Sequence, residues 1–157
     1  MKKYKMVLGG VLYFVLSASS MSVEQGVTDI ISCYLPGGDR VASFSINNET
    51  KEINYVFKKA GRTELNVYFN EKNKLKRLVD NKMGVTYYGF NRGGYSYVVD
   101  IMNGSENEEY TMSFDIKKKN KVIQSNDCLP SSFRSDDIKS NYIVDVPYVG
   151  SNQFVFP

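Results

Sequence analysis

The segment YSYVVDIM, residues 95–102, carries the strongest structural signal in this chain. Large side chains occupy every second position of it: Tyr95, Tyr97, Val99 and Ile101. Period-two alternation of aromatic and β-branched residues is typical of a half-buried β-strand. Residues 110–116 (YTMSFDI) repeat the pattern after a short loop, so the two segments predict neighbouring antiparallel strands.

Further segments of the same kind, separated by turn-forming residues, precede and follow this pair. They cover residues 30–35, 40–46, 52–58, 64–69, 75–79, 85–90 and 122–125. Short strands at this spacing predict an all-β protein, an antiparallel β-sandwich or barrel of about eight strands. No linker or internal repeat interrupts residues 21–157, which favours a single β-domain.

Four local features refine this prediction. The shorter and more charged strand at residues 75–79 is expected at a sheet edge, and the lysine-rich residues 117–120 are expected to form a solvated hairpin loop. A short helical turn is predicted to begin near Ser135. The apolar C-terminal residues 143–157 are expected to add a strand or to pack over one end of the sheet.

The N-terminus has the pattern of a secretory signal peptide. Lys2, Lys3 and Lys5 precede the apolar residues 6–16, and small residues at positions 17–20 suit a cleavage site. The apolar run is too short for a membrane-spanning helix, which needs roughly 20 residues. We therefore expect residues 1–20 to be a bacterial signal peptide, with a periplasmic or secreted mature protein and no stable membrane anchor.

Removal of this segment changes the charge of the protein. The full chain has 20 Lys and Arg residues against 17 Asp and Glu residues, a net charge of +3. Three of the basic residues lie within residues 1–20, and none of the acidic ones does. The mature chain is therefore neutral, which gives no electrostatic reason to expect a nucleic-acid partner.

Two cysteines remain in the mature chain, Cys33 and Cys128. An even count in an exported protein favours a disulfide, and two cysteines allow one intramolecular pairing. Such a bridge would tie the first strand to the end of the last core strand.

The composition argues against most catalytic chemistry. The chain has no histidine, which removes histidine-based acid–base catalysis, Ser-His and Cys-His pairs and histidine-containing zinc sites. No phosphate-binding loop or EF-hand motif occurs. The remaining carboxylate clusters, at residues 106–109 and 136–137, lie in polar loops. We therefore expect a protein that is not an enzyme and that needs no metal or cofactor.

One segment is richer in interface-type residues than folding requires. Residues 87–97 (YYGFNRGGYSY) place four tyrosines, a phenylalanine and Arg92 around a glycine turn, and Tyr and Arg commonly anchor protein interfaces. The alternative is a tyrosine-lined core with Arg92 in a solvated turn. The interface hypothesis predicts a partner-binding surface at the hairpin tip with the loop at residues 103–109 beside it, made of Tyr88, Asn91, Arg92, Tyr95, Glu106 and Glu108.

Several of these segments resemble small exported β-proteins of Gram-negative bacteria. The resemblance rests on Cys33, residues 55–65 (YVFKKAGRTEL), Tyr88 with residues 92–97 (RGGYSY), and Cys128. Lys58 stands where those proteins have a glycine. Proteins of this size and build include periplasmic lysozyme inhibitors and immunity proteins against secreted effectors, so the resemblance implies a binding protein without catalytic residues.

The functional expectation is a periplasmic protein that inhibits a toxin or a cell-wall hydrolase by occluding its active site. Its partner would be a protein, a secreted effector or a hydrolase, and the sequence does not fix the oligomeric state. The alternative is a carbohydrate-binding or adhesive module of the cell envelope that stacks exposed tyrosines on sugars.

Overall fold

The computed structural model describes residues 26–105 and 109–147, and this part of the chain is all-β. The predicted all-β class is thereby confirmed, although the described residues form eleven strands rather than about eight. The strands are β1 (Val27–Leu35), β2 (Arg40–Asn47), β3 (Ile53–Lys59), β4 (Arg62–Phe69), β5 (Leu75–Asp80), β6 (Val85–Arg92), β7 (Tyr95–Asn103), β8 (Tyr110–Lys118), β9 (Lys121–Asp127), β10 (Phe133–Arg134) and β11 (Ile143–Asp145).

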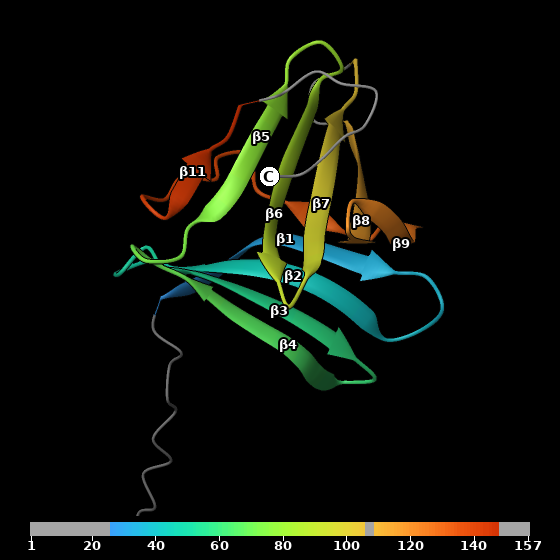
Figure 1. Ribbon diagram of the computed structural model, residues 1–157, viewed down its shortest axis with the longest axis horizontal. Helices are drawn as coiled ribbons and strands as arrows, with labels where there is room; N and C mark the ends of the chain where they lie inside the picture. The colour runs from blue at the N-terminus through green and yellow to red at the C-terminus, as the bar shows by residue number, and fades with distance from the viewer. Residues whose placement is uncertain (1–25, 106–108, 148–157) are drawn as a thin grey trace, which may run out of the picture.

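The strands form two sheets, built mostly from consecutive hairpins. The five-stranded sheet has the order β10-β1-β2-β3-β4, and the six-stranded sheet has the order β11-β5-β6-β7-β8-β9. All pairs are antiparallel except β11 with β5, which is parallel, so the second sheet is mixed rather than purely antiparallel as predicted. Figure 1 shows β2 to β4 passing beneath β5 to β7 at a steep angle.

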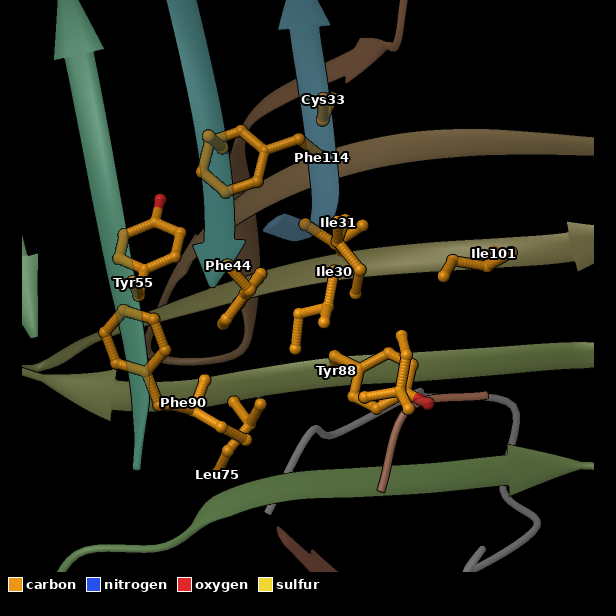
Figure 2. Close-up of a cluster of buried hydrophobic side chains, with 14 of the residues drawn as sticks. Ile30, Ile31, Cys33, Phe44, Tyr55, Leu75, Tyr88, Phe90, Ile101 and Phe114 are labelled. Carbon is orange, nitrogen blue, oxygen red and sulfur yellow. The ribbon is translucent and has the colours of Figure 1, made fainter. Parts of the chain in front are cut away.

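One hydrophobic core lies between the two sheets. Tyr55 of β3 is fully buried, and its ring contacts Phe44 of β2 and Phe90 of β6, each with ring centroids 4.9 Å apart. Figure 2 shows these residues between crossing strands, with Ile31 and Tyr88 both to one side of them. The alternation of residues 95–101 and 110–116 therefore identifies the inward-facing side of β7 and β8, where Val99, Ile101, Met112 and Phe114 are buried.

The predicted disulfide between Cys33 and Cys128 is present. Cys33 is fully buried in β1, while Cys128 directly follows β9, so the bridge connects the two sheets. Disulfides persist in oxidising compartments, which indicates that this protein functions outside the cytoplasm. None of the described residues forms a helix long and apolar enough to cross a membrane. The predicted signal peptide lies outside the described residues.

Two predictions need correction, and in both cases the reason is a contact made by the C-terminal region. No helical turn forms near Ser135, because the segment is held extended along β1, where the Ser135 amide donates to the carbonyl of Ile30 at 2.8 Å. Strand β5 is not a free edge over its first half, because β11 pairs with Leu75, Lys76 and Arg77. The expectation that the C-terminal segment adds a strand is confirmed for Ile143–Asp145, and the residues from 148 onward are outside the described part.

The lysine-rich hairpin between β8 and β9 is also less solvated than predicted. Lys119 and Asn120 form the turn with positive φ angles of 49° and 64°. Lys117, however, is buried and lies on the face of β8 that points away from the core. Its Nζ is 4.0 Å from the Asp115 carboxylate on the same face.

Candidate functional site

The predicted hairpin tip forms between β6 and β7. Gly93 and Gly94 have φ angles of +60° and +78°, the left-handed conformation that a tight two-residue hairpin requires of both central residues. Arg92 and Tyr95 are directly paired on either side of this turn. The glycine turn predicted from the sequence is therefore present.

The tyrosines of this hairpin are largely engaged in folding. Tyr88 is only 6% exposed and belongs to the core between the sheets. The Tyr97 ring stacks against that of Phe90, with centroids 5.1 Å apart. Tyr87 is half-buried on the opposite face, beside Leu78 and Val98. None of these three rings is freely exposed to a partner.

The polar residues of the tip are bound to neighbouring strands. Arg92 is exposed, but its Nη1 donates to the backbone carbonyl of Asn66 in β4 at 2.9 Å. Asn91 accepts a hydrogen bond from the Ser96 hydroxyl at 2.6 Å. The ammonium group of Lys118 lies 5.0 Å from the centre of the half-buried Tyr95 ring, within cation–π range. The tip thus joins the two sheets through side-chain contacts.

The tip and the second predicted loop lie at opposite ends of β7. The Gly93–Gly94 turn precedes this nine-residue strand, and the loop to β8 follows it, a separation of roughly 25–30 Å at 3.4 Å per residue. Glu106 and Glu108 are outside the described residues. The structure therefore does not bring the loop beside the tip, and the predicted surface divides into two separate regions.

A groove lies at the loop end of β7, lined by residues of β7 and β8 and by the segment at and after the end of β9. Strand pairing aligns Tyr87, Asp100, Ser113 and Asp127 in one row across β6 to β9. The groove has a volume of about 950 Å³. Asp100, Ser113 and Asp127 line it, and the following row contributes Met102 and Thr111.

The groove is acidic with apolar rims. Asp100, Glu109 and Asp127 line it, and its described lining includes no lysine or arginine. Met102 and Leu129, both more than 40% exposed, contribute apolar surface. Carboxylates beside exposed apolar side chains suit a cationic group on an aliphatic stem, such as a lysine or arginine of a partner protein.

Burial changes the charge state of the carboxylate in the middle of this row. Partial burial raises the pKa of Asp100 above its usual range, and the nearby Asp115 carboxylate raises it further, while a hydrogen bond from the Ser113 hydroxyl opposes the shift. Burial also lowers the pKa of Lys117, although Asp115 and Asp100 oppose that change. A positive group placed in the groove would favour the ionised form of Asp100.

Backbone contacts fix both walls of the groove. The Gly104 amide donates to the carbonyl of Glu109 at 2.8 Å, and a Cβ atom at Gly104 would lie 2.7 Å from the Glu109 Cβ. On the other wall, the Cys128 amide donates to the backbone carbonyl of Met112 at 2.9 Å, and the Leu129 amide donates to the backbone carbonyl of Tyr34 at 2.8 Å. The disulfide anchors this second wall to β1, so little ordering is needed before a ligand binds.

Sequence reasoning missed Asp100 and Asp127 as candidate binding residues. The sequence did contain a signal for one of them, because Asp100 lies in the middle of the most apolar strand. A charged residue at a solvent-facing strand position does not by itself indicate a binding site. The alignment of Asp100 with Asp127 depends on the pairing of three strands, which the sequence does not state. Within the described residues, no group of three His, Cys, Asp or Glu side chains is arranged to hold a metal ion.

Comparisons with protein-family models, with curated proteins and with solved structures found no match for this chain. The site must therefore be interpreted from its own geometry.

Proposed function

We propose that this protein is a sandwich-type binding domain of the bacterial periplasm that inhibits a toxin or hydrolase by covering its active site. The observation that carries the proposal is the acidic groove at the loop end of β7. Asp100, Glu109 and Asp127 supply negative charge without a basic residue in the described lining. Enzymes that act on anionic substrates commonly place Lys and Arg in their active sites, and such side chains fit this groove.

The scaffold supports this interpretation. The disulfide and the shared aromatic core hold the groove on paired strands, so binding costs little conformational entropy. Met102 and Leu129 offer apolar surface around the charges, the arrangement in which a buried charged contact contributes most to an interface. Occlusion of an active site requires no chemistry from the inhibitor itself.

The test begins with immobilised mature protein and a periplasmic extract of the producing bacterium. Each captured enzyme is assayed with and without stoichiometric protein. We expect the activity of one captured hydrolase or toxin to fall on addition of the protein. If every captured enzyme keeps its full activity, the inhibitor proposal is wrong.

A groove variant and a matched control locate the contact. The double change Asp100→Asn and Asp127→Asn removes two charges with little change of volume, and we expect inhibition to weaken at least about tenfold. Glu64→Gln removes an exposed acid from β4, on the other sheet, and should leave inhibition unchanged. Equal losses in both variants would show that net charge, not the groove, drives binding. Retention of the protein by cell-wall polysaccharide, with no enzyme inhibited, would favour the carbohydrate-binding alternative.

A further inference from the structure

Strand β9 forms the free edge of the six-stranded sheet within the described residues. It pairs with β8 on one side and has no described strand on the other. The remaining edges of the two sheets differ from it. Strands β10 and β11 contain only two and three residues, and the carbonyl of Asn66 in the edge strand β4 is bound by the Arg92 side chain. An edge strand with unpaired backbone groups is a template for pairing with another strand.

Strand β9 exposes two adjacent apolar side chains at this edge. Val122 and Ile123 are 53% and 56% exposed, and both are β-branched residues that favour strands. At this end of β9, the pairing with β8 is irregular: Ile116 of β8 pairs with Gln124 and Lys117 pairs with Val122, so one residue of β9 is skipped. The other half of the strand pairs regularly with β8 from Gln124 to Asp127. A second strand that covers these two apolar side chains removes them from water, which favours association.

The order of charges along β9 selects the direction of pairing. The strand begins with Lys121 and ends with Asp127. Antiparallel pairing of two copies about a two-fold axis at Gln124 places Lys121 of each copy opposite Asp127 of the other. Parallel pairing in register would instead place like charges side by side, which is destabilising.

We propose that β9 pairs in antiparallel fashion with β9 of a second copy of this chain, which joins two six-stranded sheets into one continuous sheet. A two-fold contact of this kind is self-complementary, so each copy contributes the same surface. The pairing covers Val122 and Ile123 and forms two Lys121–Asp127 ion pairs. Asp127 also lines the acidic groove, so in the dimer Lys121 of the partner subunit and a cation bound in the groove compete for the same carboxylate, while Asp100 and Glu109 stay available to that cation.

Analytical ultracentrifugation of the mature protein over a range of concentrations tests this proposal. We expect a reversible monomer–dimer equilibrium, with hydrogen exchange of the amides in β9 slowing as the dimer forms. A protein that remains monomeric at about 1 mM would overturn the proposal. A dimer in which β9 exchanges as fast as in the monomer would overturn it as well.

Charge exchange identifies the register. Lys121→Glu and Asp127→Lys should each weaken the dimer about tenfold, because each creates two like-charged contacts across the axis. The double variant restores the opposite charges and should recover most of the affinity. Arg62→Glu, at the start of the other long edge strand, is the control and should leave the dimer unchanged. An unrecovered double variant that keeps its melting temperature, or an equal effect of the control, would contradict this pairing.

Discussion

The two ends of strand β7 differ in how completely their side chains are used by the fold. At the hairpin end, Arg92 binds the backbone of β4 and Tyr97 stacks on Phe90. At the loop end, Met102 is exposed and Asp127 borders an open groove. The richer cluster of interface-type residues in the sequence thus serves to hold the two sheets together. The groove, which we propose as the binding region, lies at the end that looked plainer in the sequence.

The largest expected difference between the two ends concerns stability. Phe90 is buried and its ring contacts Tyr55 and Phe69 of the opposite sheet, so Phe90→Ala should lower the free energy of unfolding by about 3–5 kcal/mol. Met102→Ala at the groove should change it by less than about 0.5 kcal/mol, because this side chain is exposed. Urea unfolding of both variants measures the contrast. Similar losses would mean that the loop end of β7 is packed as firmly as the hairpin end.

Removal of the disulfide should have the next largest effect. Cys33→Ser combined with Cys128→Ser is expected to cost about 2–5 kcal/mol in stability. Because Cys128 anchors one wall of the groove, we expect local hydrogen exchange to rise at Leu129 before it rises at the hairpin tip. Hydrogen exchange with mass spectrometry below the unfolding transition separates the two regions. Uniform loss of protection would contradict a local role for the bridge.

A smaller effect is expected at the hairpin tip itself. Arg92→Ala removes the hydrogen bond to the Asn66 carbonyl and should lower stability by about 0.5–1.5 kcal/mol. Affinity for the inhibited enzyme should remain unchanged, because the groove is at the other end of β7. Melting temperature and affinity are measured on the same preparation. A large loss of affinity at unchanged stability would restore the hairpin tip as the binding surface.

The smallest predicted effect is a dependence on pH at the groove. The folded-state pKa of Asp100 is raised, chiefly by burial, so this group stabilises the fold at low pH and loses that contribution as the pH rises through its folded pKa. Asp100→Asn should therefore gain melting temperature relative to wild type as the pH increases from about 3 to about 7. Thermal scans of both proteins across this range measure the difference. A constant difference would show that Asp100 titrates as an ordinary exposed aspartate.

The sequence predicted correctly those parts of the fold that depend on neighbouring residues within one strand or on the number of cysteines. Alternation within residues 95–102 predicted that Val99 and Ile101 share a face of β7, and both are buried, because successive side chains of a strand point to opposite sides. The pairing of Cys33 with Cys128 followed from there being only two cysteines in the mature chain.

The parts that were missed depend on contacts between residues far apart in the chain. Ser135 suited a helix start locally, yet its amide bonds to Ile30, more than a hundred residues earlier. The parallel pairing of β11 with β5 is likewise non-local. The groove depends on the register of β7, β8 and β9, which brings Asp100 and Asp127 into one row. A reading of single segments contains no information about such alignments.

The disulfide has a consequence for the order in which this protein is made. Its cysteines are 95 residues apart, near the beginning and the end of the described chain. In a chain that leaves a membrane pore N-terminus first, Cys33 emerges as a free thiol long before its partner. The bridge can form only after β1 to β9 have been delivered, while β10 and β11 still follow. Oxidation of this pair therefore requires the first nine strands, and a chain interrupted before Cys128 keeps an unpaired thiol in its first strand.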